Sequence, residues 1–291
     1  MTESTESFVL PPAADPAALL ALLRAPRAGI VTDIDGTIAP FALTPASATV
    51  DLRARAALAR LTLRLALVAA LTGRRAMDGA TLIGIPEMLV VGNHGMETLS
   101  GTTLSAEPSV APYVVPVQRM LARLREFDLP AGTLIEEKGP TASVHYRLAT
   151  DWVAARNQLF ALMTPLAVAE NLLLTEGRAI IEVRPPVPVN KGRALRSLRE
   201  EYALDTLIML GDDLTDVDAF HALHEMREAG TVRGAAIGVL VAGGETPPEI
   251  LQAADAIVTG VSGTADLLTA FADGLESVAD ERQPRFSPAP E

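Results

Sequence analysis

The chain has 291 residues, a length that fits about two domains at roughly 150 residues each. Its 24 basic and 36 acidic residues give a formal net charge of −12, so non-specific binding to nucleic acid or to anionic membranes is not expected. Hydrophobic residues make up 49% of the chain, enough for a sizeable core. The sequence has no cysteine, which excludes disulfides, thiolate zinc sites, iron–sulfur clusters and cysteine nucleophiles.

The start of the chain does not fit a secretory signal. The segment MTESTESFVLPP has glutamates but no lysine or arginine before its short apolar patch. The apolar run at 65–71 is far shorter than the about 20 residues that a membrane span needs. We therefore expect a cytoplasmic protein, with flexible, polar, proline-rich tails at 1–15 and 277–291.

Short apolar runs alternate with helical patterns along most of the chain. In chain order, the sequence predicts a strand at 28–32, a helix at 46–61, strands at 65–71 and 88–91, a helix at 192–202, strands at 207–210, 235–241 and 256–258, and a helix at 264–272. Buried strands separated by helices are typical of an α/β fold with a mostly parallel sheet. Such sheets bind ligands beyond the carboxyl ends of their strands, where Asp33, Thr72, Asn93 and Asp212 each follow an apolar run.

The middle of the chain has a different pattern. It predicts a helix at 115–127, strands at 133–137 and 143–147, a helix at 151–162, and a hairpin of strands at 171–175 and 179–183 that turns at Glu176-Gly177. This order suggests a small α+β domain inserted into the α/β domain, between proline-rich hinges at 108–116 and 185–188. The expected division is a core of 16–108 and 186–276 around an insert of 109–185.

Two acidic groups carry the sharpest chemical signal, Asp33-Ile34-Asp35-Gly36-Thr37 and Gly211-Asp212-Asp213-Leu214-Thr215-Asp216. Two carboxylates ~4 Å apart repel each other by ~4 kcal/mol at an effective dielectric constant of ~20, and a divalent cation removes this penalty. Oxygen ligands without cysteine favour Mg²⁺ over zinc. Alternatively, the first group is an acidic turn and the second is a helix N-cap, but a joint occurrence favours the cation site.

Two further residues supply what a phosphate group needs. Lys191, at the start of a predicted helix, can neutralise a phosphoryl oxygen or a carboxylate. Thr72 can donate from its hydroxyl, and Gly73 allows close approach of the backbone. Taken singly, Lys191 is more typical of a surface lysine, and Thr72-Gly73 is more typical of an ordinary turn.

In order and spacing, Asp33-x-Asp35-Gly36-Thr37, Thr72-Gly73-Arg74, Lys191 and Gly211-Asp212-Asp213-x-x-Asp216 resemble the four motifs of phosphatases of the haloacid dehalogenase (HAD) superfamily. The insert resembles a C2-type cap. The segments 92–97, 136–139, 145–147, 181–185 and 210–216 further resemble the trehalose-6-phosphate phosphatase family, and the resemblance covers about residues 28–270. Arg184 stands where many relatives have lysine, which keeps the charge but changes its geometry.

This resemblance implies a HAD-like Rossmannoid core and a Mg²⁺-dependent phosphatase that hydrolyses trehalose 6-phosphate through an aspartyl-phosphate. The implied catalytic residues are the nucleophile Asp33, the acid and base Asp35, and the charge-stabilising Thr72 and Lys191. The implied Mg²⁺ ligands are the Asp33 carboxylate, the Asp35 backbone carbonyl and Asp212, while Asp213 and Asp216 orient metal-bound water or Lys191. The implied substrate-binding residues are Gly36, Thr37, Gly73, Arg74, Asn93, His94, Glu136, Lys138, His145, Arg147 and Glu182.

Several alternatives stay open at this point. The substrate could be another sugar phosphate, such as sucrose phosphate or mannosyl-phosphoglycerate, or the chain could be a non-catalytic sugar-phosphate-binding subunit of a synthase. The presence of both Asp33 and Asp35 favours an enzyme. We expect a monomer, with a trehalose-phosphate synthase as a candidate partner. His221 and His224 have no third ligand nearby in sequence and are not expected to bind a metal.

Overall fold

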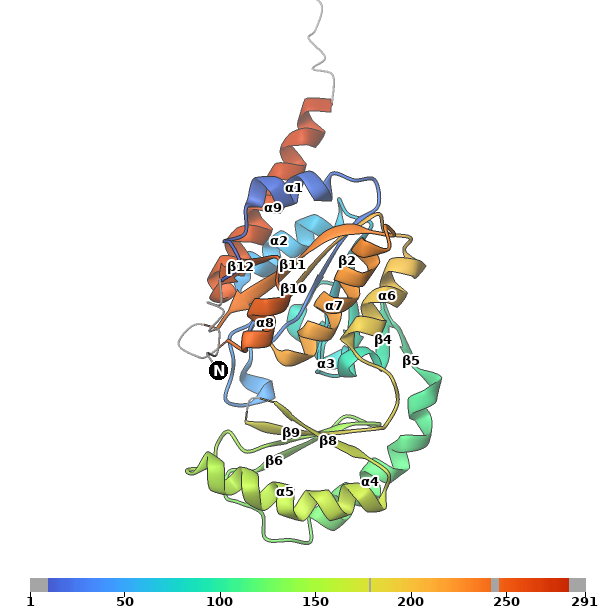
Figure 1. Cartoon of the computed structure of the whole chain (residues 1–291), viewed down its shortest axis with the longest axis vertical. Coiled ribbons are helices and arrows are strands. Elements are labelled where there is room, and N and C mark those ends of the chain that lie inside the picture. The colour runs from blue at the N-terminus through green and yellow to red at the C-terminus, as the bar shows by residue number, and fades with distance from the viewer. Residues whose placement is uncertain (1–9, 178, 242–245, 283–291) are drawn as a thin grey trace, which may run out of the picture.

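The computed structural model describes residues 10–177, 179–241 and 246–282, with side chains up to residue 277. Two units, each built on its own sheet, lie one above the other in Figure 1. The larger unit has an eight-stranded sheet and the smaller a four-stranded sheet. This arrangement confirms the predicted α/β fold with an inserted α+β unit. Among the described helices, none has the length and apolar character that a membrane crossing requires.

The large sheet has the strand order β12-β11-β10-β1-β2-β3-β4-β5. Its parallel strands are β1 (Ala28–Thr32), β2 (Leu67–Leu71), β3 (Leu89–Gly92), β10 (Thr206–Gly211), β11 (Arg233–Leu240) and β12 (Ala256–Thr259). An antiparallel hairpin of β4 (Glu97–Ser100) and β5 (Thr103–Ala106) completes one edge. The register pairs Thr32 with both Leu210 and Ala70, so the carboxyl ends of β1, β2 and β10 meet at one place.

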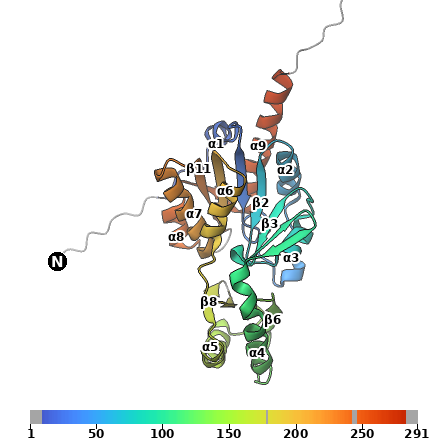
Figure 2. The same ribbon diagram turned by 90° about the vertical axis from the view of Figure 1, so that its right-hand side faces the viewer.

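Helices cover both faces of the large sheet, as Figure 2 shows edge-on. One face packs against α1 (Pro16–Leu23), α2 (Leu52–Thr62), α3 (Ala76–Ile83) and α9 (Gly260–Arg282). The other packs against α6 (Lys191–Glu201), α7 (Leu214–Glu228) and α8 (Pro248–Ala253). Because successive strand residues point to opposite faces, Ile30 joins the first core and Val31 the second. Both faces are therefore buried, which explains the continuous apolar runs.

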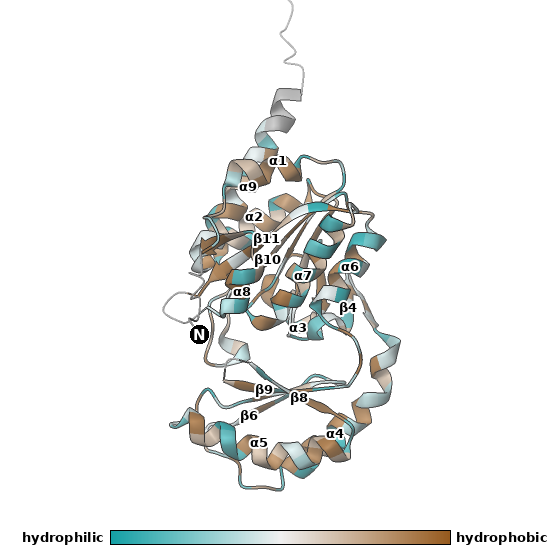
Figure 3. Cartoon of the chain, viewed as in Figure 1, coloured by the Kyte–Doolittle hydropathy of each residue, from teal (hydrophilic) through white to brown (hydrophobic). Residues whose placement is uncertain are grey.

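The smaller unit, called the cap below, is a two-layer module. Its antiparallel sheet has the order β6-β7-β9-β8 and is built from β6 (Leu134–Glu137), β7 (Ala142–His145), β8 (Leu173–Gly177) and β9 (Ile180–Arg184). The helices α4 (Val114–Leu124) and α5 (Trp152–Ala169) lie on the face away from the large unit (Figure 1). Hydrophobic residues on β8, β9, α4 and α5 stand out in Figure 3, and a separate cluster that includes Val117, Leu159 and Ile181 forms the core. The other face of the cap sheet faces the large unit and is called the open face below.

The predicted tails are wrong in part. The backbone N–H of Ala14 donates to the carbonyl of Ile257 at 2.8 Å, and the N–H of Ile257 donates to the carbonyl of Pro12 at 2.9 Å. Residues 12–14 therefore extend the edge of the large sheet. At the other end, α9 continues to Arg282, beyond the predicted limit of 276. Residues 1–9 and 283–291, the rest of both tails, lie outside the described residues.

Several predicted boundaries also shift for local reasons. The helix predicted at 46–61 begins at Leu52, because Asp51 caps it by accepting from the backbone N–H groups of Arg53 and Ala54. The cap hairpin turns after Gly177, which pairs with Ile180, and not at Glu176-Gly177. The short 3₁₀ helix at Pro108–Tyr113 places Val110 in a cluster with residues of the large unit, so the first residues of 109–185 pack on the core.

Candidate active site

The candidate active site is a cavity of about 920 Å³ between the carboxyl ends of the large sheet and the open face of the cap. Parallel sheets place ligands at this edge because their loops converge there. From the large unit it is lined by Asp33, Asp35, Thr72, Gly73, Arg74, His94, Lys191, Asp212 and Asp213, and from the cap by Glu136, Lys138, His145, Arg147, Glu182 and Arg184. Its size is within the usual range of small-molecule sites.

Asp33 and Lys191 form the floor of this cavity. The Asp33 backbone N–H donates to the carbonyl of Leu210 at 2.9 Å, which extends β1 into the pairing with β10. Lys191 opens α6, where Asn190 is the N-cap, and its side chain is 1% exposed. Its Nζ donates to Oδ1 of Asp33 at 2.8 Å and to Oδ1 of Asp216 at 2.7 Å. The lysine is therefore shared between the first and last acidic motifs.

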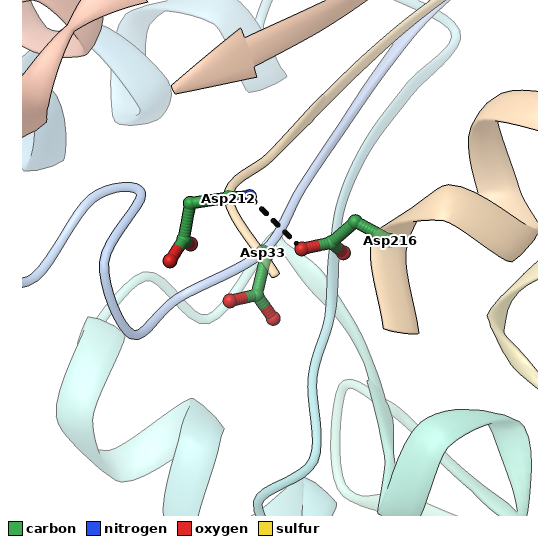
Figure 4. Close-up of side chains that lie close together, drawn as sticks. All are labelled: Asp33, Asp212 and Asp216. Carbon is green, nitrogen blue, oxygen red and sulfur yellow. Dashed lines mark hydrogen bonds between the residues drawn. The ribbon is translucent and has the colours of Figure 1, made fainter. Parts of the chain in front are cut away.

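Asp216 is held by the start of α7. Its Oδ2 accepts from the backbone N–H groups of Asp212 at 3.0 Å and Asp213 at 3.1 Å, and Oδ1 accepts from Lys191. Figure 4 shows the first of these bonds and the way the three aspartates Asp33, Asp212 and Asp216 converge. Both oxygens of Asp216 are thus engaged by the protein, which fixes Lys191 in place.

Asp212 is the carboxylate with room for a further partner. The hydroxyl of Thr37 donates to its Oδ1 at 2.7 Å, while its buried Oδ2 has no hydrogen-bond partner among the described residues. Gly36, with φ of +94°, passes so close that a Cβ there would clash with the Asp212 carboxylate. One oxygen each of Asp33, Asp212 and Asp216 lie within 4.8 Å of one another. An orphaned buried oxygen in such a cluster is what a bound metal ion would satisfy, so the residues fit a cation.

The electrostatics of the cluster agree with this. Burial raises the pKa of Asp33 well above its usual value and Asp216 adds to this effect, while Lys191 opposes it. Burial and the neighbouring Asp33 likewise raise the pKa of Asp212, and burial raises that of Asp216 to about 6. Despite its own burial, Lys191 has a raised pKa because Asp216 and Asp33 favour its charged form. One ammonium faces three carboxylates, which leaves an excess of negative charge for a cation to neutralise.

Asp35 and Arg74 form a fork-to-fork ion pair at the cavity wall. Nε of Arg74 donates to Oδ2 of Asp35 at 2.6 Å, and Nη2 donates to Oδ1 at 2.7 Å. Burial opposes the charge of Arg74, but the bonds to Asp35 outweigh it and raise the guanidinium pKa. Both residues were expected in the site from the sequence, but nothing in the sequence predicts that they pair.

The loops after β2 and β3 bring together Thr72, Gly73, Asn93 and His94. Thr72 is buried, and its carbonyl accepts from the N–H of His94 at 2.9 Å. Burial, Lys191, Arg184 and Lys138 lower the pKa of His94 well below 6.5, so its ring is neutral at pH 7. The side chain of Asn93 is turned toward the cap backbone, where it donates to the carbonyl of Lys138 at 3.3 Å and accepts from the hydroxyl of Thr141 at 2.8 Å.

The cap contributes a polar network on its open face. His145 Nε2 and Glu136 Oε2 lie 3.0 Å apart, and the hydroxyl of Ser143 donates to Glu182 at 2.7 Å. Nζ of Lys138 lies 3.7 Å from Glu182 and 3.9 Å from Glu136. Burial opposes the charge of Glu136, but the hydrogen bond with His145 and the charge of Lys138 prevail and lower its pKa. Charged hydrogen-bonding groups thus line the roof of the cavity.

Contacts between the two units hold the cavity together. Nζ of Lys138 donates to the carbonyl of Gly73 at 2.9 Å, and Nη1 of Arg147 donates to the carbonyl of Ala42. Phe41, Ala42, Thr44 and Pro45 also line the cavity, although we did not expect this segment to take part. Its apolar and small residues carry no chemical signal, and only its place after the first acidic motif could have pointed to it.

Three residues expected in the site make hydrogen bonds that the sequence did not predict. Asp213, expected to orient metal-bound water or Lys191, is exposed at the cavity and caps α7 by accepting from the N–H and hydroxyl of Thr215 at 2.8 and 2.7 Å. Asn93, expected at the substrate, links the core to the cap as described above. Thr37, also expected at the substrate, has its hydroxyl bound to Asp212. In each case a short polar side chain meets a nearer backbone or carboxylate partner first.

The chain is similar in sequence to a family of phosphatases and to its curated members. The trehalose-phosphatase family model matches residues 31–242. A curated relative named trehalose-phosphate phosphatase, from Mycobacterium marinum, is 33% identical over 210 residues, which is 69% of this chain and 53% of the relative. The chain therefore spans about half the length of this curated relative.

Solved structures share the fold. The C-terminal domain of trehalose-6-phosphate phosphatase from C. albicans superposes with a TM-score of 0.73 at 24% identity, covering 90% of this chain and 98% of that one. A haloacid dehalogenase-like hydrolase from Bacteroides thetaiotaomicron gives a TM-score of 0.59 at 16% identity, over 83% and 98% of the two chains. With the family model matching well over half of its residues, the chain belongs to the trehalose-phosphatase family.

Proposed function

We propose that this chain hydrolyses trehalose 6-phosphate to trehalose and phosphate. The observation that carries the proposal is that Asp33 lies on the floor of the cavity between the two units, paired with Lys191, below a roof of sugar-compatible polar groups. A phosphoryl group at Asp33 would place its attached sugar against the cap. The family membership and the curated relatives support the same reaction.

In the proposed reaction, Asp33 attacks phosphorus, and an Asp33 Oδ–phosphorus bond forms as the bond from phosphorus to the sugar oxygen breaks. The departing sugar oxygen receives a proton from Asp35. Asp35, now a carboxylate, then takes a proton from a water molecule whose oxygen attacks phosphorus, which releases phosphate and restores both aspartates. Lys191 and Thr72 stabilise negative charge on the phosphoryl oxygens throughout.

We propose Mg²⁺ as the cation of this site, because its donors are all oxygens. The ligands would be the carboxylates of Asp33 and Asp212 and the backbone carbonyl of Asp35, with Asp216 holding Lys191 beside them. When bound, the ion supplies positive charge that offsets the cluster of carboxylates and the incoming phosphate. The orphaned Oδ2 of Asp212 supports this assignment.

The cap would select the sugar. Glu136, Lys138 and Glu182 present acceptors and a donor that suit the many hydroxyls of a disaccharide, and His145 and Arg147 extend the same surface. The neutral ring of His94, whose buried Nδ1 has no hydrogen-bond partner among the described residues, can bind a hydroxyl near the phosphate. Closure of the cap would exclude bulk water from the reaction.

We further propose that the chain acts in the cytoplasm as a monomer. A trehalose-phosphate synthase is its candidate partner. Gel filtration and co-purification with a synthase test these two proposals.

The test is phosphate release from a panel of sugar phosphates with and without Mg²⁺. Trehalose 6-phosphate should be among the best substrates by kcat/KM, and removal of Mg²⁺ should abolish turnover. A clear preference for sucrose phosphate or mannosyl-phosphoglycerate would reassign the substrate but keep the chemistry. Asp33→Asn should fold but release no phosphate, since an amide cannot form the intermediate; substantial release by this variant would refute the nucleophile.

A further inference from the structure

The guanidinium of Arg74 donates hydrogen bonds to two other residues of the protein, Asp35 and Pro45. Besides the two bonds to Asp35, its Nη1 donates to the carbonyl of Pro45 at 3.0 Å, so each of its three side-chain nitrogens has a protein acceptor. The Arg74 side chain is 13% exposed, whereas the Asp35 side chain is 30% exposed. Both side chains line the cavity, and the carboxylate is the more exposed of the two.

The backbone of Arg74 is anchored as firmly as its side chain. Its N–H donates to Oγ1 of Thr72 at 3.2 Å, and its carbonyl accepts from the N–H of Asn93 at 2.7 Å. Gly92 passes close by, since a Cβ at that position would lie 2.8 Å from the Arg74 carbonyl oxygen. Arg74 thus ties the loop after β2 to the loop after β3, and its side chain reaches across to the loop after β1.

We infer that Arg74 is a positioning residue for Asp35. This inference rests on the proposed role of Asp35 as acid and base. A carboxylate has about four lone-pair sites, two on each oxygen. The fork of Arg74 occupies one lone-pair site on each oxygen. The remaining sites can hold the proton that Asp35 gives to the sugar oxygen and, later, the proton that it takes from water.

The bidentate geometry is what makes this orientation definite. A planar guanidinium that meets both carboxylate oxygens fixes the rotation of the carboxylate plane, whereas a single ammonium does not. Asp35 lies next to Gly36 and is partly exposed, so without the fork its side chain is free to turn away from the leaving group. Proton transfer depends on such positioning within hydrogen-bond reach.

The choice of leaving group tests the inference. A sugar alkoxide is a poor leaving group and needs a proton as the bond breaks, whereas 4-nitrophenolate leaves without one. The value of kcat/KM reports the steps up to this departure, so kcat/KM would be measured for trehalose 6-phosphate and 4-nitrophenyl phosphate. Arg74→Met should lower kcat/KM on the sugar phosphate by about 10-fold or more, as part of the 10²–10⁴-fold contribution of general acid catalysis. On the aryl phosphate it should change kcat/KM by less than about 3-fold.

Two variants serve as comparisons. Arg74→Lys keeps the charge but not the fork, and it should fall between the wild type and Arg74→Met on the sugar phosphate. Arg75→Met removes the adjacent, exposed arginine at the N-cap of α3 and should behave as the wild type on both substrates. Thermal melting of each variant reports whether the fold is intact. An equal loss on both substrates would overturn the inference, as would a loss confined to a raised KM.

A double-mutant cycle with Asp35→Asn separates this inference from the proposed function. If Arg74 acts through Asp35, adding Arg74→Met to Asp35→Asn should cost little further on the sugar phosphate. Additive losses would show that Arg74 acts independently and would overturn the inference. If Asp35→Asn lowers kcat/KM equally on both substrates, then Asp35 is not the general acid, and it is the proposed function that is contradicted.

Discussion

Nζ of Lys191 donates a hydrogen bond to Oδ1 of Asp33 at 2.8 Å, across 158 residues of sequence. The ion pair is buried, and Asp216 completes it on the other side of the ammonium at 2.7 Å. This relationship connects stability to chemistry, because the ammonium that stabilises the carboxylates in the folded protein is also the group that we propose meets the phosphate.

Lys191→Met should destabilise the protein and stop turnover. Removing one partner of a buried ion pair costs about 3–5 kcal/mol because the remaining charges lose their compensation. We expect a loss of this size in the free energy of unfolding without metal, and a fall in kcat of about 10²-fold or more. Urea denaturation and phosphate release measure the two effects. Arg193→Met, on the exposed side of the same helix, should change stability by less than about 0.5 kcal/mol.

Metal binding should depend on Asp212 and not on Asp213, although the two residues are adjacent. Mg²⁺ at about 100 times its Kd should stabilise the wild-type protein by about 2.7 kcal/mol. Asp212→Asn should lose this stabilisation, because the substitution removes the negative charge of the carboxylate whose buried Oδ2 has no hydrogen-bond partner among the described residues. Asp213→Asn should keep most of it, since that exposed carboxylate caps α7 and is not one of the three clustered carboxylates. Thermal melting with EDTA and with Mg²⁺ checks both. An unchanged response of Asp212→Asn would contradict the assigned cation site.

Glu136 and Glu137 form a matched pair on β6, since neighbours in a strand point to opposite faces. Glu136 faces the cavity and His145, whereas Glu137 lies on the surface 3.5 Å from Arg125. A hydrogen bond to a charged group contributes about 1.5–3 kcal/mol, so Glu136→Gln should lower kcat/KM for trehalose 6-phosphate by about 10- to 100-fold. Glu137→Gln should stay within about 2-fold of wild type.

The control for this pair is 4-nitrophenyl phosphate, which lacks the sugar. Both glutamine variants should hydrolyse it at close to the wild-type rate. Equal losses for the two variants on the sugar phosphate would mean that the open face of the cap does not read the sugar.

Asp255 should make stability depend on pH in the acid range. Its two oxygens accept from Arg227 at 2.8 and 2.7 Å, and Oδ2 also accepts from the N–H of Ala236 at 2.8 Å. Burial opposes the charge, but these bonds prevail and lower the pKa below its usual 3.8. A lowered pKa in the folded state means that the stabilisation is complete above 3.8, the pKa expected for the unfolded chain, and is lost as pH falls through the folded value.

Asp255→Asn should therefore lower the free energy of unfolding by about 1 kcal/mol at pH 7. The difference from wild type should shrink as pH falls through the folded pKa of Asp255, because the wild-type carboxyl is then protonated as well. Urea denaturation at several pH values measures the difference. A gap that persists at acid pH would point to packing and not to the carboxylate charge.

The carboxyl ends of the core strands could be predicted from the sequence. Strands buried on both faces are continuous apolar runs, so the residue where polarity returns marks the carboxyl end. The predicted strand 28–32 coincides with β1, and Asp33 follows it directly. By contrast, the hairpin of β4 and β5 was missed, because β5 is exposed along its whole length and has no alternating pattern.

The sequence did not predict which polar residues contact one another in the folded protein. Asp213 and Asp216 stand in one motif, yet the exposed Asp213 caps α7 at Thr215, whereas the buried Asp216 binds Lys191. Asn93 adopts φ of +48°, and its amide turns to the cap, a contact that no local pattern encodes. Arg74 was expected at the substrate, and its bidentate pairing with Asp35 is a contact that the sequence did not predict.

The sequence by itself determined the α/β class, the inserted domain and the acidic, lysine and threonine residues at the strand ends, because burial and turn chemistry leave local patterns. Only the tertiary structure decided which oxygen of which aspartate is engaged and which is left without a partner. Those outcomes depend on distances between segments more than a hundred residues apart, as with Thr37 and Asp212. Such distances follow from packing of the whole sheet and cap, and no short stretch of sequence contains them.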